Sequence, residues 1–179
     1  MKAIVSATIR LRHPEHFVVG EDSIVDDFCY FSTKMCIGRG SHIAASCTIG
    51  GGVQWQFTMG DFSSLSAGVT VWCASNDYVR DLVMPVPNGI GAIEHHAIVG
   101  DVTLGNYTGV GANTVIMPDN QIPEGTVVGA LSFVPPRFSF ERWAVYAGNP
   151  LRLIRMRDRE SVLAQVRAVE EGLRRRDRP

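Results

Sequence analysis

The sequence lacks long apolar runs and paired cysteines. No run of apolar residues approaches the ~20 that span a bilayer, and residues 1–5 do not lead into the extended apolar segment of a signal peptide. The four cysteines form no C-x-x-C pair and are too sparse for a small disulfide-stabilised domain. We therefore expect a cytoplasmic protein without a membrane span, whose cysteines serve as small apolar core residues.

Net charge is nearly absent as well. A formal charge of -1 over 179 residues gives the chain no overall attraction for nucleic acid, which is not expected as a partner. Arginines nevertheless gather between Arg152 and Arg176. Such a cluster is either a solvated surface or a site for phosphate groups, which guanidinium groups bind in a bidentate manner.

What the chain does contain is an apolar residue at every sixth position over long stretches. Three runs keep this step, and they are Val19, Val25, Phe31, Ile37, Ile43, Ile49 and Trp55; Met59, Leu65 and Val71; and Ile98, Leu104, Val110, Ile116, Ile122, Val128 and Val134. The residue that follows is often glycine or another small residue. A period of six fits neither the 3.6 of a helix nor the alternation of a simple strand.

This period predicts an all-β fold, a triangular solenoid known as a parallel β-helix. Each hexapeptide forms a short strand and a turn, so three of them complete a coil of about eighteen residues. The apolar residue points inward and stacks on its counterpart in the next coil. Small residues occupy the corners, where a large side chain would crowd the bend.

The segment after the repeats, residues 146–154, reads Tyr-Ala-Gly-Asn-Pro-Leu-Arg-Leu-Ile. Together with the repeats it resembles the hexapeptide-repeat acyltransferase superfamily, closest to the sugar and nucleotide-sugar acetyltransferases. The resemblance implies a left-handed β-helix and an acetyltransferase. Acetyl-CoA would be the co-substrate, no metal would be needed, and the acceptor would be an amine or hydroxyl of a saccharide or nucleotide-linked sugar.

Two interruptions and a tail complete the predicted organisation. The six-residue step slips by four residues around Gln56–Thr58, and it stops in a loop over residues 74–97. In the resembled family such a loop reaches a neighbouring subunit, which implies a homotrimer. The predicted β-helix domain spans residues 1–155, and residues 156–179 form a C-terminal helix, expected over Asp158–Leu173, and a basic tail.

Acetyl transfer requires a base that removes the proton of the acceptor, and histidine is the usual residue for this role. Of the five histidines, His95 and His96 lie where the loop returns to the coil, whereas His13, His16 and His42 are expected on the surface. Asp77, at the start of the loop, could act as the base, orient a histidine or hold an acceptor ammonium. Its neighbours Asn76 and Tyr78 are expected to contact the acceptor.

The resemblance places coenzyme A beside the C-terminal coils. Backbone groups at Gly111, Ala112, Ala130 and Ser132 would contact its pantetheine arm, although the same residues would also be small if the corners alone required it. Arg152 and Arg155, just after the last coil, are the candidates for its phosphates.

Two other functions remain open at this level. A γ-type carbonic anhydrase has the same kind of solenoid but needs three histidines around one zinc. The side chains of adjacent His95 and His96 would diverge on a strand, and His42 lies several coils earlier. A non-catalytic scaffold is the second alternative, and the segment at residues 146–154 argues against it.

Overall fold

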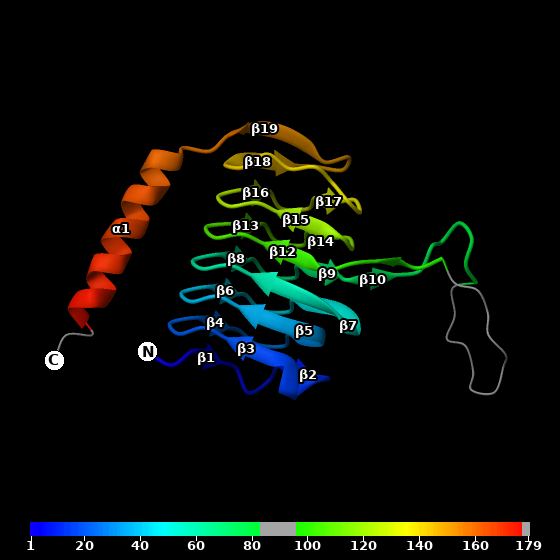
Figure 1. Cartoon of the computed structure of the whole chain (residues 1–179), viewed down its shortest axis with the longest axis horizontal. Coiled ribbons are helices and arrows are strands. Elements are labelled where there is room, and N and C mark those ends of the chain that lie inside the picture. Colours follow the sequence, from blue (N-terminus) through cyan, green and yellow to red (C-terminus); the bar gives the residue numbers. More distant parts are fainter. Residues whose placement is uncertain (83–95, 177–179) are drawn as a thin grey trace.

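The computed structural model describes residues 1–82 and 96–176 (Figure 1). The chain forms a parallel β-solenoid of about six turns, followed by a single helix, α1 (Arg159–Arg176). The coils stack from the N-terminal end to the C-terminal end, and α1 then runs back along one side of the stack. The predicted β-helix is thereby confirmed. The helix begins one residue later and ends three residues later than expected.

Two parallel sheets make up the walls of the solenoid. The first has eight strands, in the order β1 (Ile4–Val5), β4 (Ile24–Val25), β6 (His42–Ile43), β8 (Ser64–Leu65), β13 (Gly109–Val110), β16 (Val127–Val128), β18 (Ala144–Ala147) and β19 (Arg152–Met156). Only β19 runs antiparallel to its neighbour, β18. Because it reverses direction, β19 closes the C-terminal end of the stack.

The second sheet has nine strands and covers the other two walls. They are β2 (Arg10–Leu11), β3 (Phe17–Val19), β5 (Tyr30–Ile37), β7 (Thr48–Met59), β9 (Thr70–Trp72), β12 (Val102–Leu104), β14 (Val115–Ile116), β15 (Asn120–Ile122) and β17 (Phe133–Val134). The 3-10 helix η1 (Pro14–His16) joins β2 to β3. A separate antiparallel pair, β10 (Ala74–Ser75) and β11 (Ile98–Val99), projects from the solenoid.

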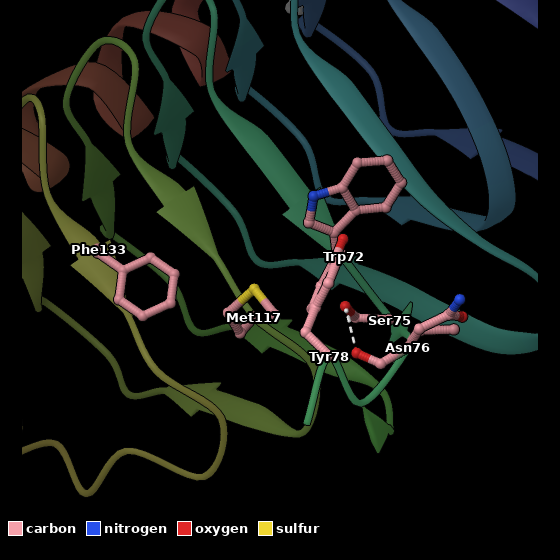
Figure 2. Close-up of a pocket in the computed structure, with 7 residues that line it drawn as sticks. Trp72, Ser75, Asn76, Tyr78, Met117 and Phe133 are labelled. Carbon is pink, nitrogen blue, oxygen red and sulfur yellow. Dashed lines mark hydrogen bonds between the residues drawn. The ribbon is translucent and has the colours of Figure 1, made fainter. Parts of the chain in front are cut away.

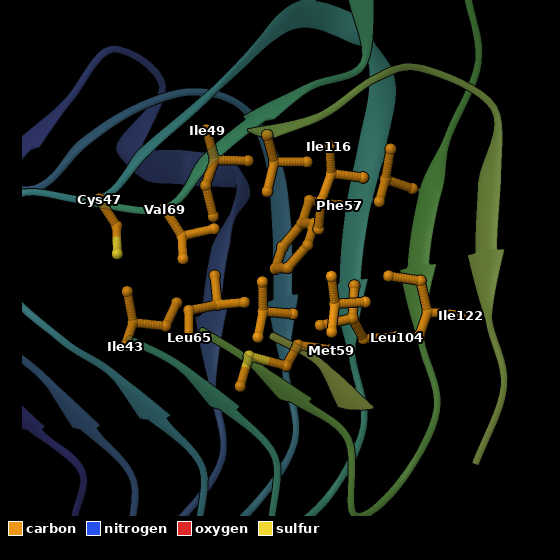
Figure 3. Close-up of a cluster of buried hydrophobic side chains, with 14 of the residues drawn as sticks. Ile43, Cys47, Ile49, Phe57, Met59, Leu65, Val69, Leu104, Ile116 and Ile122 are labelled. Carbon is orange, nitrogen blue, oxygen red and sulfur yellow. The ribbon is translucent and has the colours of Figure 1, made fainter. Parts of the chain in front are cut away.

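The six-residue apolar period produces the core (Figure 3). In the first sheet, Val25 pairs with Ile43 and Ile43 with Leu65, so the inward side chains of successive coils lie over one another. These three side chains are at most 1% exposed. Each fully buried side chain of this kind contributes roughly 1.5–3 kcal/mol, so the stack, rather than any single coil, holds the fold together.

The corners explain why the repeat needs small and hydroxylated residues. The hydroxyl of Ser41 donates to the carbonyl of Gly60 at 2.8 Å, and that of Ser63 donates to Gly105 at 3.0 Å. Each buried hydroxyl thus joins one coil to the next. A Cβ on Gly60 would lie 2.6 Å from the backbone nitrogen of Asn106, so only glycine permits this close approach.

Two predictions about the repeat are wrong. Phe31 pairs with Ile49, eighteen residues on, but Ile37 pairs with Met59, twenty-two residues on, so four extra residues enter β7 between these points. Trp55 lies within this insertion and is only partly buried, whereas Phe57 takes the inward position. Ile98 does not open the third run, because it pairs with Ser75 at the base of the loop.

Helix α1 fastens distant coils together on the side away from β10 and β11 (Figure 1). Glu170 accepts a hydrogen bond from Arg39 at 2.7 Å, and Arg176 pairs with Asp22 at the same distance. Asp22 also binds the N-terminal ammonium of Met1 at 2.7 Å. In the two described segments, no helix combines the length and apolarity that crossing a membrane requires.

Candidate active site

The long insertion leaves the solenoid through a short two-stranded stem. Ser75 of β10 pairs with Ile98 of β11, which brings the two ends of the loop together. The predicted loop over residues 74–97 thus leaves and rejoins the solenoid at this stem. Its residues 83–95, which include the candidate base His95, lie outside the described residues.

Asp81 joins the two sides of this stem. One of its oxygens accepts the backbone N–H of His96 at 2.9 Å, and the other accepts the backbone N–H of Asp77 at 3.1 Å. The Asp81 side chain is only 1% exposed. Its pKa lies below the ordinary value for an aspartate, chiefly because of the hydrogen bond from the His96 backbone. Asp81 is thus an ionised residue that holds both described ends of the loop.

The His96 ring is held by the same carboxylate. Its Nδ1 lies 3.1 Å from Asp81 Oδ1, and the side chain is one-third exposed. Assigning the Nδ1 proton to this hydrogen bond makes Nε2 the basic nitrogen of the neutral ring. This is the arrangement of a histidine that is oriented by an aspartate and can accept a proton.

Asp77 is engaged in a different way. Its carboxylate accepts the backbone N–H of Val79 at 2.9 Å and pairs with Arg80 Nε at 2.6 Å. These two contacts hold the pKa of Asp77 below its ordinary value, with the Val79 hydrogen bond as the largest cause. A carboxylate of lowered pKa is a weak base near neutral pH. The geometry therefore favours a role for Asp77 in shaping the turn at residues 77–81.

An open pocket of about 510 Å³ lies where the stem meets the solenoid (Figure 2). Trp72, Met117 and Phe133 provide an apolar surface from three coils, and the loop adds Ala74, Ser75, Asn76 and Tyr78. In Figure 2, Met117 lies between Phe133 on one side and the loop residues Ser75, Asn76 and Tyr78 on the other. Asn76 and Tyr78, predicted to contact the acceptor, do line the pocket. Asp77 and His96 belong to the adjoining stem rather than to the lining.

The apolar part of this pocket was missed in the sequence, although a signal for it exists. Trp72, Met117 and Phe133 each lie directly beside a buried inward residue, in an outward position where the repeat usually has a small or polar side chain. Large apolar residues at outward positions of three coils indicate a binding surface. Asp81 has no comparable signal in the sequence, because its partners, two backbone N–H groups and the His96 ring, are brought to it only by the fold.

The four residues predicted to contact pantetheine lie at another corner. The hydroxyl of Ser132 is buried, donates to Gly129 at 2.7 Å and accepts the backbone N–H of Gly148 at 2.9 Å. A Cβ on Gly111 would lie 2.2 Å from the nitrogen of Ala130. The carbonyl of Ala112 accepts the backbone N–H of Leu131. Packing of the corner therefore accounts for these small residues, and of the four only Ala130 is well exposed.

Arg152 and Arg155 lie on β19, at the C-terminal end of the solenoid, and both are exposed. Among the described residues, neither guanidinium has an ion-pair partner. The neighbouring Arg157 differs, because it donates to the carbonyl of Gly125 at 2.9 Å and burial lowers its pKa. Of the three arginines, Arg152 and Arg155 are thus available to a ligand.

The zinc alternative requires three histidines around one metal. Within residues 1–82 and 96–176 of a single chain, no three His, Cys, Asp or Glu side chains gather in this way. His42 instead pairs with Asp26 at 2.8 Å on the face of the first sheet. No metal ligand set is therefore assigned.

Comparison with known proteins gives a consistent result. No protein-family model matches the chain. The dTDP-4-amino-4,6-dideoxy-D-glucose acyltransferase of Escherichia coli is 30% identical over 154 residues, which cover 82% of this chain and 74% of that protein. The structure of AntD, an N-acyltransferase from Bacillus cereus in complex with dTDP and 3-hydroxybutyryl-CoA, is 31% identical and matches with a TM-score of 0.84 over 95% of this chain and 88% of AntD.

A substituted form of AntD has been solved in complex with dTDP-4-amino-4,6-dideoxyglucose and coenzyme A. A hexapeptide-repeat acetyltransferase from Vibrio cholerae, 21% identical, matches with a TM-score of 0.63 over 79% of this chain and 75% of its own, which supports the fold alone. The solenoids of these structural neighbours are left-handed. Because a mirror-image coil would not superpose so closely, the predicted left hand is confirmed.

Proposed function

The chain belongs to the hexapeptide-repeat acyltransferases, and from this we propose that it transfers an acyl group from coenzyme A to the amino group of a nucleotide-linked amino sugar. The observation that carries the proposal is the pocket at the base of the inserted loop, whose apolar surface faces polar loop residues. Both AntD and the Escherichia coli relative act on such acceptors or bind them. Acetyl is the acyl group expected from the sequence.

The pocket suits the chemistry of this transfer. The amine attacks the thioester carbonyl, the tetrahedral intermediate collapses, the C–S bond breaks and coenzyme A leaves as the thiol. Trp72, Met117 and Phe133 would contact the acyl group and the adjoining pantetheine, since they form the apolar side. Asn76 and Tyr78 would hold the acceptor through their amide and hydroxyl groups.

We propose that His96, on the stem that adjoins the pocket, accepts the proton of the acceptor, and that Asp81 positions its ring. His96→Ala should then lower kcat by about 10²–10⁴-fold. His16→Ala is the control, because His16 also lies near a carboxylate, that of Glu15 at 3.8 Å, but is exposed on η1 and lines neither this pocket nor the first sheet. If His96→Ala lost no more activity than His16→Ala, the amine would lose its proton without His96.

Arg152 and Arg155 are proposed to bind phosphates of coenzyme A. The support is their exposure and their lack of an ion-pair partner among the described residues. Arg152→Ala should raise KM for acetyl-CoA by about tenfold, as expected for one charge-assisted contact. An unchanged KM would mean that these arginines belong to a solvated surface and do not bind coenzyme A.

A homotrimer is proposed for the active form. The outward residues of the first sheet are small or short in its central strands, with Ser64 on β8, Gly109 on β13 and Val127 on β16. Such a smooth, half-buried face can pack closely against a second copy. Light scattering at micromolar concentration should give three times the chain mass, and a monomer mass would contradict the proposal.

The cytoplasmic location expected from the sequence stays a prediction.

Thiol release from acetyl-CoA tests the function itself. The acceptors would be dTDP-4-amino-4,6-dideoxyglucose, the corresponding dTDP-sugar with a hydroxyl in place of the amine, and free glucosamine. We expect turnover with the first acceptor alone. Turnover with the hydroxyl sugar and not with the amine would contradict N-acyl transfer.

A further inference from the structure

A second pocket lies on the same edge of the solenoid, toward the N-terminal end. Its volume is about 330 Å³, and it is lined by Arg12, His13, Ser32, Gly52, Val53 and Gln54. The four-residue insertion in β7, which includes Val53 and Gln54, forms one wall of it. The insertion that interrupts the repeat and this pocket are therefore the same feature of the molecule.

The two pockets are joined by one column of residues. Along this edge, Leu11 pairs with Phe31, Phe31 with Ile49, Ile49 with Val71 and Val71 with Ile116. The residue after each of these points outward, and the column they form on successive coils is Arg12, Ser32, Gly50, Trp72 and Met117. It changes from a guanidinium at one end to an indole and a thioether at the other.

Gly50 lies on the coil between Ser32 and Trp72 in this column. A Cβ on Gly50 would lie 2.7 Å from the indole of Trp72 and 3.2 Å from the hydroxyl of Ser32. Trp72 lines the larger pocket and Ser32 the smaller one. The indole of Trp72 therefore lies on the backbone of Gly50, and a ligand that spans both pockets has to lie over this indole.

The wall of the smaller pocket is held in place from within. Thr33 is 3% exposed, and its hydroxyl lies 2.9 Å from the carbonyl of Gly52 and 2.7 Å from that of Trp55. Gly52 has a φ of +78°, a conformation that favours glycine. The single proton of this hydroxyl can be donated to either carbonyl, so a buried side chain holds the insertion in place and prepares it to bind a ligand at little cost in ordering.

Charge identifies the kind of ligand. Arg12 is exposed, and no hydrogen bond or ion pair within the described residues engages its guanidinium. His13 lies beside it, with Nδ1 3.6 Å from the well-exposed carboxylate of Glu15. An unpaired guanidinium in a pocket that the Ser32 hydroxyl and the His13 ring also line suits a phosphate or diphosphate.

We propose that this smaller pocket binds the diphosphate of the nucleotide-linked acceptor, with Arg12 as its principal contact. The inference rests on the proposed function and adds the direction in which the acceptor lies along the solenoid. At about 4.8 Å per coil, Arg12 and Trp72 are roughly 14 Å apart along the edge. A sugar attached to a diphosphate at Arg12 extends past Ser32 and over the exposed indole of Trp72 toward Asn76, where it meets the thioester. The acceptor thus enters from the N-terminal end and the donor from the C-terminal end.

Coenzyme A also contains a diphosphate, so the test must separate the two ligands. Calorimetric titration of the full-length protein with dTDP and, in a separate experiment, with coenzyme A does so. Arg12→Ala should weaken dTDP binding by about tenfold or more, leave coenzyme A binding within twofold, and raise KM for the dTDP-sugar while kcat stays close to that of the wild type. Arg12→Lys should restore part of the loss, because the charge remains but the bidentate contact does not.

Arg142→Ala is the matched control, since Arg142 is exposed and lies outside both pockets. It should bind both ligands as the wild type does. If Arg12→Ala bound dTDP normally while the wild type bound it well, or if it weakened coenzyme A instead, the inference would be wrong although the proposed function would stand. If the wild type bound coenzyme A but neither dTDP nor UDP, the proposed acceptor class would be wrong, and the inference with it. Equal melting temperatures of the variants would show that folding is unchanged.

Discussion

His96 and Asp81, fifteen residues apart, make two contacts through a single carboxylate oxygen, because Asp81 Oδ1 accepts the His96 backbone N–H at 2.9 Å and lies 3.1 Å from its Nδ1. The same carboxylate accepts the backbone N–H of Asp77 through its other oxygen. The position of the loop and the orientation of the histidine are therefore coupled. A change that releases one of them also releases the other.

Replacing Asp81 tests this coupling. Asp81→Asn removes the charge and leaves one side of the amide unable to accept, so we expect faster amide hydrogen exchange at residues 76–82 and 96–99 and a loss of kcat similar to that of His96→Ala. Asp77→Asn should affect the turn at residues 77–81 but leave the exchange rate of the His96 amide largely unchanged. Equal effects of the two substitutions on His96 would show that Asp81 has no special role.

The apolar side of the larger pocket should select the acyl group. Phe133→Ala enlarges it, so we expect the ratio of kcat/KM for butyryl-CoA over acetyl-CoA to rise by about tenfold, the scale of one or two methylene groups in an apolar pocket. Leu131→Ala is the control, because Leu131 is 73% exposed, lies two residues away and does not line the pocket. An unchanged ratio in Phe133→Ala would place the acyl group elsewhere.

Two glycines should respond oppositely to alanine. Gly125 has a φ of +72°, and a Cβ there would lie 2.3 Å from the ring of Trp143. Gly125→Ala should therefore lower the free energy of unfolding by about 1–3 kcal/mol. Gly172 is in α1 with no atom near its Cβ position, so Gly172→Ala should raise the stability of the helix by roughly 0.5–1 kcal/mol. Urea unfolding measures both, and destabilisation by Gly172→Ala would contradict this account.

Acid should weaken the attachment of α1. The pKa of Asp22 lies far below its ordinary value, first because Arg176 hydrogen-bonds to it and then because the N-terminal ammonium does. A carboxylate whose folded pKa is lowered stabilises the fold above its unfolded pKa of about 3.9 and loses this effect as pH falls through the folded value. The difference in melting temperature between the wild type and Asp22→Asn should thus be largest near pH 6 and shrink below pH 4. A difference independent of pH would mean that charge is not the cause.

Only one of the four cysteines should react with a thiol reagent in the folded protein. Cys36 is exposed, whereas Cys29, Cys47 and Cys73 are buried, and burial raises the pKa of Cys73 to about 11. A thiol of raised pKa is mostly protonated at pH 8 and therefore unreactive. One equivalent of reagent should be consumed by the wild type and none by Cys36→Ser. Rapid reaction of more than one thiol without denaturant would contradict the burial of the other three cysteines.

Much of the fold follows directly from the sequence. The six-residue period determines the solenoid, because an inward apolar residue and a small corner residue are local requirements that every coil repeats. Leu65 and Val110 are buried as their place in the period predicts. The ends of the long loop can also be predicted from the sequence, because the six-residue period stops there. The helix can be predicted because a helical period follows the last coil. The resemblance of residues 146–154 to the acyltransferases supplied the chemistry.

The site depended on the tertiary structure. Trp55 continued the period in the sequence, yet Phe57 is the residue that packs inward, because the register of β7 is set by its pairing with β5 rather than by counting. Arg12, Ser32, Gly50, Trp72 and Met117 share one edge only because the insertions between them have particular lengths. An outward residue carries no local signal of its neighbours on other coils. The sequence determined which side chains point out, and the stacking of coils decided which of them meet.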